Sequence, residues 1–178
     1  MKILVTYASR HGATKQIAER IAAKLHAAAL DLPEHRGQPD LLAYDAFVIG
    51  SAAYMGHWLP DASAFVREYA GLLAKHPVWL FSSGPLGTEE TDAKGRDLRE
   101  VAEPEEIDQL RELVRPRDHH VFFGALDPAN LGFREGLIRV IPAGRRLLPE
   151  GDFRDWAEVD AWAEGIAAEL AAMAPAGG

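Results

Sequence analysis

The sequence predicts an α/β fold in which a parallel sheet lies between two layers of helices. The first observation is that its clear apolar runs are continuous rather than alternating, which is typical of strands buried on both faces. These runs cover residues 2–7, 46–51, 78–81 and 121–125. The second observation is that helix-like segments separate the runs, and strands that alternate with helices form parallel sheets. We therefore expect a single domain over residues 1–174, followed by a disordered tail at 175–178.

The chain opens with a strand and a helix. The uninterrupted apolar residues 3–5 predict a buried first strand. The next segment, 14–29, carries Ile17, Ile21 and Leu25 at a spacing of four, with charged residues between them. This spacing places the three apolar side chains on one face of an amphipathic helix.

The later elements follow the same two patterns. In chain order they are a short strand at 28–32, a strand at 46–51, a helix at 61–74, a strand at 78–81, a helix at about 105–114, a strand at 121–125 and a helix at 156–173. Pro77 starts the strand at 78–81, and the turn residues 82–85 stop it. Asp155 is suited to cap the last helix, because its side chain can accept from free backbone N–H groups. Two stretches interrupt the alternation, a charged one at 86–118 and an arginine-rich one at 130–148.

The composition excludes several classes of protein. The chain contains no cysteine, which excludes disulfides, thiolate metal sites and cysteine nucleophiles, so redox chemistry would need a bound cofactor. The net charge is −8, from 19 basic and 27 acidic residues, which disfavours general nucleic-acid binding. No apolar run has the length of a membrane span, and the first residues lack the pattern of a secretory signal. We expect a cytoplasmic protein.

The loop after the first strand has the residues of an anion site. Ser9, Gly12 and Thr14 lie between the strand and the first helix. Ligands bind at the carboxyl ends of the strands in such sheets, and the backbone N–H groups of a helix N-terminus attract anions. The two hydroxyls and Arg10 would add hydrogen bonds to a phosphate, whereas a simple helix cap is the alternative interpretation. The loop matches neither Gly-x-x-x-x-Gly-Lys-Ser/Thr nor Gly-x-Gly-x-x-Gly, which disfavours a P-loop or a dinucleotide site.

Two more strand ends carry small residues. One strand leads into Ser-Ala-Ala-Tyr-Met-Gly-His-Trp at 51–58, and the next leads into Ser-Ser-Gly-Pro-Leu-Gly at 82–87. The carboxyl ends of parallel strands meet at one edge of a sheet, so we expect these segments beside the first loop. Tyr54 and Trp58 offer aromatic faces for stacking, although one of them could belong to the core instead. Together the three loops suit a flat aromatic ligand with a phosphate group.

These loops resemble those of the flavodoxin superfamily, whose members hold flavin mononucleotide (FMN) with them. The resemblance implies a flavodoxin-like three-layer fold, with a five-stranded parallel sheet in the order 2-1-3-4-5. It also implies that the first loop contacts the phosphate of FMN, that the other two contact the edge of its ring, and that Trp58 or Tyr54 stacks on the ring. The cofactor-binding residues expected on this basis are Ser9, Arg10, His11, Gly12, Ala13, Thr14, Ala52, Ala53, Tyr54, Met55, Gly56, Trp58, Ser83, Gly84, Pro85 and Gly87.

A closer resemblance, to the menaquinone-dependent protoporphyrinogen dehydrogenases, runs along nearly the whole chain. It rests on Ser-Arg-x-Gly-x-Thr at 9–14, Gly-His-Trp at 56–58, Gly-Ala-Leu-x-Pro at 124–128 and Asp-Trp at 155–156. It implies an oxidoreductase of haem biosynthesis that passes hydrogens from protoporphyrinogen IX to menaquinone. No side chain in the sequence is an obvious general base for this reaction.

Two other functions stay open. The first is a flavodoxin-type electron carrier without its own substrate, which would dock to redox partner proteins through its acidic surface. The second is an interaction module that has lost FMN. It stays open because Arg10 and His11 stand where electron-carrier flavodoxins usually have hydroxyl-bearing and small residues.

The segment 130–148 combines apolar side chains with Arg134, Arg139, Arg145 and Arg146. A basic, apolar segment in an acidic protein indicates contact with an anionic membrane surface or a hydrophobic partner. For a quinone-linked enzyme this would be a peripheral contact at the inner face of the cell membrane. The alternative is a helix that packs on the core and leaves its arginines in water.

The histidines and serines indicate no further chemistry. His57 could donate a hydrogen bond near the flavin or lie on the surface. His119 and His120 open a strand and should point to opposite faces of the sheet, so a paired metal site is not expected. No Gly-x-Ser-x-Gly motif surrounds Ser51 or Ser83, so a serine hydrolase has no support.

Overall fold

The computed structural model describes the chain apart from residues 33, 35–39, 128, 130–148 and 174–178. In the described part, the sheet has the parallel order β2-β1-β3-β5-β6. These strands are Ile3–Ala8 (β1), Ala28–Asp31 (β2), Ala46–Tyr54 (β3), Val78–Ser83 (β5) and Asp118–Phe122 (β6). A two-residue strand, β4 (His57–Trp58), pairs antiparallel with the end of β3. Once β4 is set apart, the predicted order 2-1-3-4-5 is confirmed.

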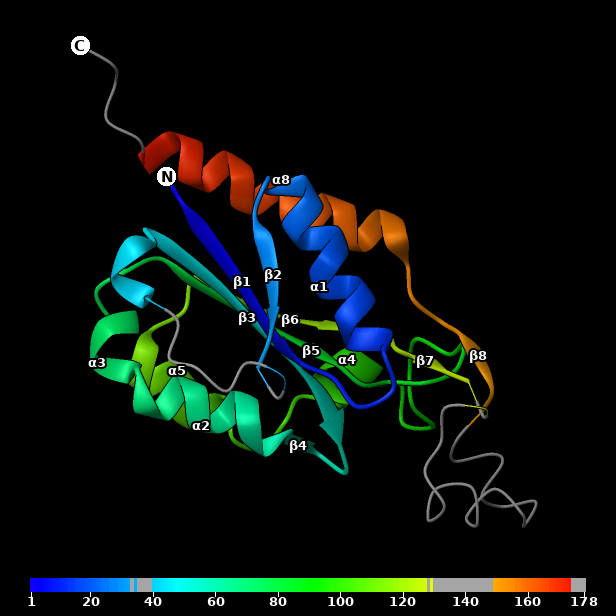
Figure 1. Ribbon diagram of the computed structural model, residues 1–178. Helices are drawn as coiled ribbons and strands as arrows, with labels where there is room; N and C mark the ends of the chain where they lie inside the picture. Colours follow the sequence, from blue (N-terminus) through cyan, green and yellow to red (C-terminus); the bar gives the residue numbers. More distant parts are fainter. Residues whose placement is uncertain (33, 35–39, 128, 130–148, 174–178) are drawn as a thin grey trace.

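Helices cover both faces of this sheet, which confirms the three-layer α/β fold (Figure 1). The first face carries α1 (Ala13–Lys24) and α8 (Trp156–Met173), and the second carries α2 (Pro60–Glu68), α3 (Ala70–Leu73) and α5 (Ile107–Val114). The remaining described elements are a 3₁₀ turn at Leu41–Ala43, the short helix α4 (Leu98–Val101) and the antiparallel pair β7 (Ala125–Leu126) and β8 (Gly151–Asp152).

Side chains that alternate along the strands build one core on each side of the sheet. On β5, Trp79 and Phe81 pack in the cluster that contains α1 and α8. Val78 and Leu80 pack in the cluster that contains α2, α3 and α5. All four side chains are fully buried, and burying each contributes about 1.5–3 kcal/mol. The strand therefore belongs to both cores, as its continuous apolar sequence predicts.

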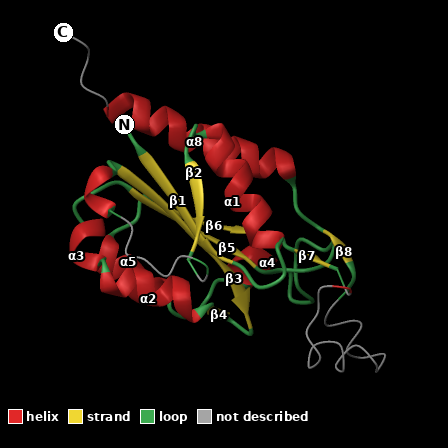
Figure 2. Cartoon of the chain, in the orientation of Figure 1, coloured by secondary structure: helices red, strands yellow, loops and turns green. Residues whose placement is uncertain are grey.

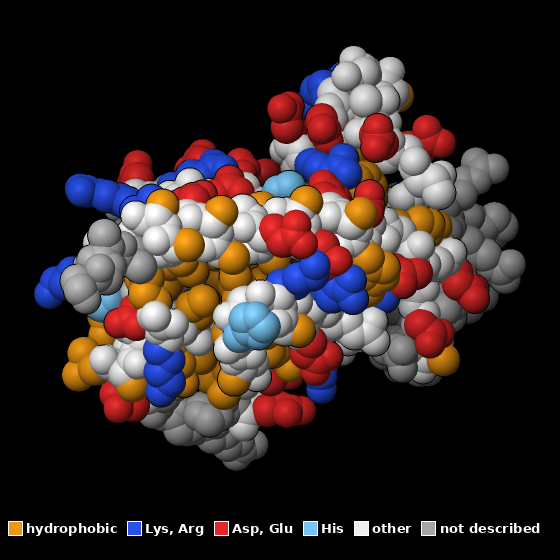
Figure 3. Space-filling view, turned by 90° about the horizontal axis from the view of Figure 1, so that it is seen from above, with side chains coloured by type: hydrophobic (Ala, Val, Ile, Leu, Met, Phe, Trp, Pro, Cys, Tyr) orange, Lys and Arg blue, Asp and Glu red, His pale blue; other side chains and the backbone are white. Residues whose placement is uncertain are grey.

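Ion pairs join α1 to α8 on the outside of the first face. Arg20 donates two hydrogen bonds of 2.6 Å to the Asp160 carboxylate, and Lys24 donates one of 2.8 Å to Glu164. The hydrogen bond from Arg20 lowers the pKa of Asp160 to about 2. Figure 3 looks onto this face and shows acidic and basic side chains lying next to one another. The pairs fix how the last helix lies against the first.

Helix α1 is shorter than predicted. The sequence pattern extends the helix over 14–29, but α1 ends at Lys24. The chain turns at His26, which has a φ of +51°, and the N–H of Ala27 donates back to the carbonyl of Ala22. The residues that follow leave the helix to form β2.

Other boundaries also differ from the prediction, and the strands expected at 46–51 and 78–81 continue to Tyr54 and Ser83. The helix expected at 61–74 is divided into α2 and α3 at Tyr69, where φ is −101° and ψ is 13° (Figure 2). The strand expected at 121–125 begins instead at Asp118 and ends at Phe122, because the backbone of 118–120 pairs with β5. The apolar run marks only the later part of this strand, whereas His119 and His120 lie at its start, as their expected position at the opening of a strand requires.

Two predictions fall on residues outside the described part, namely the membrane contact at 130–148 and the disordered tail at 175–178. Both stay predictions. Among the described helices, none combines the length and the apolar composition that crossing a bilayer requires.

Candidate functional site

The carboxyl ends of β1, β3 and β5 meet at one edge of the sheet, and a cavity of about 280 Å³ opens between the loops that follow them. Its lining consists of Ser9, Arg10, His11, Ala13, Thr14, Ala52, Ala53, Tyr54, Met55, Ser83, Gly84, Leu86, Gly124, Ala125 and Leu126. Arg10 and His11 are in this set, and none of these lining residues is a carboxylate. In a chain of net charge −8, such a lining favours an anionic ligand.

The loop between β1 and α1 has the features of an anion site. Gly12 has a φ of +88°, which glycine adopts without strain, and its N–H donates to Ser9 Oγ at 3.1 Å. Helix α1 begins at Ala13, so its first backbone N–H groups lack partners within the helix. Thr14 is 2% exposed and lines the cavity. The loop thus places hydroxyls and helix N–H groups at one end of the cavity, and their contact with a phosphate stays a prediction.

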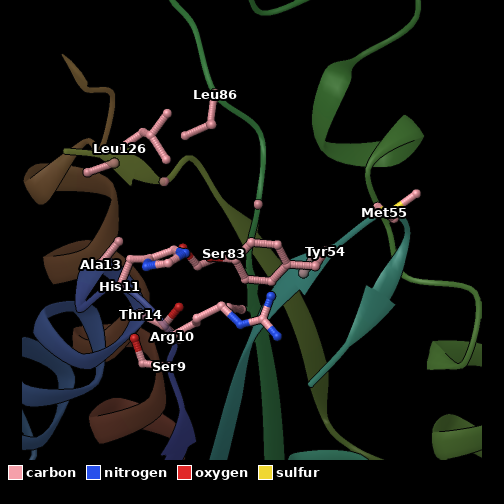
Figure 4. Close-up of a pocket in the computed structure, with 15 residues that line it drawn as sticks. Ser9, Arg10, His11, Ala13, Thr14, Tyr54, Met55, Ser83, Leu86 and Leu126 are labelled. Atoms are coloured by element: carbon pink, nitrogen blue, oxygen red, sulfur yellow. The ribbon is translucent and has the colours of Figure 1, made fainter. Parts of the chain in front are cut away.

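Tyr54 lies in the cavity lining, next to two residues of the first loop. The guanidinium carbon of Arg10 lies 5.2 Å from the centre of the Tyr54 ring, and the His11 ring lies edge-on to it at 5.9 Å. Figure 4 shows the Arg10 and His11 side chains reaching toward Tyr54, while Met55 points away. A tyrosine in this position can stack on a planar ligand.

Small residues leave room at the end of β5. A β-carbon at Gly84 would lie 3.1 Å from the Cβ of Ala53, and one at Gly124 would lie 3.5 Å from Ser83 Oγ and from the Leu86 side chain. Figure 4 shows Leu86 and Leu126 on the side of the cavity away from Ser9 and Thr14. The cavity therefore has a polar end at the first loop and an apolar end for a ring system.

A tight hairpin carries Tyr54. Met55 and Gly56 connect Tyr54 to His57 with φ values of +51° and +80°, the signs that a type I′ turn requires. The N–H of Glu105 donates to the carbonyl of Gly56 at 2.9 Å, and the N–H of Trp58 donates to Glu106 Oε1 at 3.0 Å. The residues before α5 thus hold the hairpin at the cavity.

Trp58 belongs to the core rather than to the cavity lining. Its side chain packs in the cluster with α2 and α5, and its indole N–H donates to Ser82 Oγ at 2.7 Å. Trp58 pairs with Ala53, the neighbour of Tyr54 on β3, so Trp58 and Tyr54 face opposite sides of the sheet. The expected choice between the two aromatic residues is therefore resolved in favour of Tyr54 at the cavity.

The structure brings most of the other expected site residues together. Four of them lie beside the cavity rather than in its lining: Gly12, Gly56, Pro85 and Gly87. Gly12 and Gly87 each line a neighbouring cavity, and the carbonyl of Pro85 accepts from the N–H of Gly124. His57 is exposed and lies 3.3 Å from Glu106, on the hairpin rather than in the lining.

Sequence reasoning did not place residues 124–126 in the site, although they line the cavity together with Leu86 of the expected segment 82–87. The signal was the run Gly-Ala-Leu directly after β6, a fourth strand end with small residues. No group of histidine and acidic side chains that could hold a metal ion occurs among the residues that the structure describes.

Comparisons with known proteins agree with this architecture. The solved structures that are similar in fold include three examples. They are rubredoxin oxygen:oxidoreductase from Desulfovibrio gigas (TM-score 0.60, 14% identity, 98% of this chain and 37% of that chain), a flavodoxin from the domain Archaea (0.54, 17%, 96% and 99%) and oxidised flavodoxin 1 from Bacillus cereus (0.51, 16%, 73% and 89%). This chain thus spans little more than a third of the D. gigas protein. At these identities the likeness shows the fold alone.

No curated protein matches the chain. The model of one protein family, described as flavodoxin domain, matches residues 4–141. This match includes β1, the loop that follows it and the three strand ends around the cavity. Because it spans well over half of the chain, the protein belongs to the flavodoxin domain family.

Proposed function

We propose that this protein binds FMN in the strand-end cavity and acts as an oxidoreductase, which passes hydrogens from a reduced substrate such as protoporphyrinogen IX to a quinone. The observation that carries the proposal is the cavity itself, with a phosphate-type loop at one end and Tyr54 with small residues at the other. FMN would supply the hydride and electron chemistry, while the protein binds it, orients it and limits the access of water.

The residues fit the two parts of FMN separately. Ser9, Thr14 and the N-terminus of α1 suit the phosphate dianion, because hydroxyls and free N–H groups donate to it. Tyr54 suits the planar ring, and Gly84 and Gly124 line the cavity without side chains that would fill it. The absence of a carboxylate from the described lining also supports a ligand with two negative charges.

The substrate and the acceptor rest on sequence resemblance. Ser-Arg-x-Gly-x-Thr at 9–14 and the Gly-Ala-Leu run at 124–126 resemble motifs of quinone-linked protoporphyrinogen dehydrogenases, and both segments contribute to the cavity. A quinone dissolved in lipid would be reached through the basic segment 130–148, which would make the protein peripheral to the membrane.

An electron carrier is the second candidate, and the net charge of −8 favours it, because an acidic surface attracts basic partner proteins. Met55 adds an apolar side chain that is 97% exposed at the edge of the cavity, where a partner could make contact. A carrier would exchange electrons singly with such partners and would need no substrate pocket.

One series of measurements tests the proposal. Purified apoprotein is titrated with FMN and with riboflavin, and flavin fluorescence is followed. FMN should bind more than about tenfold tighter, because riboflavin lacks the phosphate. The FMN-loaded protein is then mixed anaerobically with protoporphyrinogen IX. Bleaching of the flavin absorbance, and its return when menaquinone is added, would establish the enzyme.

Other outcomes decide between the two remaining functions, an electron carrier and an interaction module. A flavin that ignores protoporphyrinogen IX, and that a chemical reductant reduces in two separate one-electron steps, would favour the carrier. If the protein binds neither FMN nor riboflavin, the proposed function is wrong and an interaction module is favoured.

A further inference from the structure

A buried chain of hydrogen bonds runs from the cavity hairpin to the protein surface. The indole N–H of Trp58 donates to Ser82 Oγ at 2.7 Å, and Ser82 Oγ lies 2.8 Å from His119 Nε2. On the other side of the ring, His119 Nδ1 lies 2.8 Å from Glu103 Oε1. The side chains of Ser82 and His119 are completely buried. Glu103 in turn forms an ion pair with Arg111, which is partly exposed.

The donors and acceptors along this row of hydrogen bonds can be assigned from Trp58 to Glu103. An indole N–H can only donate, so it occupies one acceptor site on Ser82 Oγ. The Glu103 carboxylate can only accept, so it receives the proton on His119 Nδ1. His119 is assigned as the neutral tautomer, in which Nε2 accepts the hydroxyl proton of Ser82. Burial lowers the pKa of His119 and outweighs the opposing hydrogen bond to Glu103, which agrees with a neutral ring.

The order serine, histidine, glutamate resembles a hydrolytic triad, but these residues cannot act as one. Ser82 has no exposed surface, and its oxygen already accepts the indole N–H. A nucleophile needs a substrate carbonyl within reach of its oxygen. These hydrogen bonds must therefore act through the parts of the structure that they connect.

What they connect is the hairpin that carries Tyr54. Trp58 is paired with Ala53 across β3 and β4. The hydrogen bond that holds the indole therefore also restrains the backbone of Ala53 and of the next residue, Tyr54. Ser82 is the neighbour of Ser83, and Ser83 lines the cavity. The chain thus ties two walls of the cavity to β6 and to the residues before α5.

We propose that His119, acting through Ser82 and Trp58, is a positioning residue that holds the Tyr54 side of the cavity in place for the cofactor. This inference rests on the proposed FMN site. His119 does not touch the cavity lining, and its effect reaches the cofactor only through the two residues between them.

The test compares His119→Leu, Ser82→Ala and the double variant with His120→Leu as a matched control. His120 is the next residue on β6, but it faces the other side, where it contacts Phe122 and bonds to Glu158. FMN affinity is measured by fluorescence titration, and the residual fluorescence and visible circular dichroism of the bound flavin are recorded at saturating FMN. Thermal unfolding confirms that each variant is folded at the assay temperature.

We expect His119→Leu and Ser82→Ala each to weaken FMN binding about tenfold, the size that a lost buried hydrogen bond gives. Because both act in one chain, the double variant should bind no more weakly than the weaker single variant. The spectra of bound FMN should change alike in all three, since Tyr54 is displaced. His120→Leu should keep the wild-type affinity and spectra. His119→Gln, which keeps an acceptor and a donor, should recover part of the affinity.

Three results would overturn the inference. They are wild-type FMN affinity and spectra in His119→Leu, additive losses in the double variant, and an equal loss in His120→Leu. If His119→Leu does not fold, Ser82→Ala, which removes only one oxygen, decides the question by the same measurements. Failure of the wild-type protein to bind FMN would instead overturn the proposed function, and the inference with it.

Discussion

The ring of Phe81 lies directly over Gly50, its partner on the neighbouring strand, so closely that a β-carbon at position 50 would overlap the ring. Phe81 is completely buried and contacts Phe122 and Trp162 edge-on. The small residue on β3 is therefore what allows a large aromatic side chain at the centre of the core beneath α1 and α8.

Gly50→Ala should lower the free energy of unfolding by about 1–3 kcal/mol, because the new β-carbon would displace the Phe81 ring, which is completely buried and packed against Phe122 and Trp162. Chemical denaturation measures the change. Gly165→Ala in α8 is the matched control, because nothing lies within 4 Å of a β-carbon there. It should raise the free energy of unfolding by about 0.5–1 kcal/mol through helix propensity. Equal stability of Gly50→Ala and wild type would show that Phe81 can adjust.

Met55→Asn should stabilise the protein by about 1 kcal/mol. Met55 has a φ of +51° in the hairpin turn, where a long side chain is strained and asparagine is favoured. The side chain is 97% exposed, so little packing is lost. Chemical denaturation measures this change as well. Leu42→Asn is the control, because Leu42 is also an exposed apolar residue, at 83%, but has no positive φ. This variant should give no gain in stability. A loss of stability in Met55→Asn would mean that Met55 makes contacts that outweigh its backbone strain.

The stability of the protein should fall as the pH is lowered below about 6.5. Burial lowers the pKa of His119 in the folded state, so the unfolded chain takes up a proton at a higher pH than the folded one does. Stability therefore decreases from the ordinary histidine pKa down to the folded-state pKa of His119, by at most about 1.4 kcal/mol per pH unit from this group.

A second decrease should follow at lower pH. Burial alone would raise the pKa of Glu103, but hydrogen bonds from Arg111 and His119 outweigh it and leave the pKa below its ordinary value. The stability contributed by this carboxylate is lost as the pH falls through that lowered pKa. Urea denaturation between pH 7.5 and pH 4 measures both decreases. His119→Gln should remove the decrease just below pH 6.5, and an unchanged profile in this variant would contradict the assignment.

The parts of the fold that the sequence predicts are those with local causes. The apolar run at 3–5 and the spacing of Ile17, Ile21 and Leu25 each lie within one element, so periodicity alone identifies β1 and most of α1. The anion loop is equally local, because its glycine, hydroxyls and helix start are consecutive. These features follow directly from residue order.

Long-range relationships account for what the sequence could not predict. Which of Tyr54 and Trp58 faces the cavity depends on where the hairpin reverses, and this is set by the positive φ at Met55. Ser82 and His119 are 37 residues apart, and only the pairing of β5 with β6 brings them together. The same pairing explains why the polar residues 118–120 form a strand although their pattern does not favour one.

Gly12→Val should weaken FMN binding more than about tenfold while changing riboflavin binding little. A β-carbon at this position meets no protein atom within 4 Å, so the loss would come from the backbone, which must leave a φ of +88° and withdraw the loop from the phosphate. Gly95→Val is the matched control, because Gly95 also has a positive φ, +77°, with open space around it, in a turn outside the cavity lining. Both variants should lose about 1–3 kcal/mol of unfolding free energy from backbone strain. Fluorescence titrations with the two flavins then separate this shared strain from the loss of phosphate contacts. If Gly12→Val and Gly95→Val bind FMN equally well, the phosphate does not lie at this loop, and the cofactor site must be sought at another strand end.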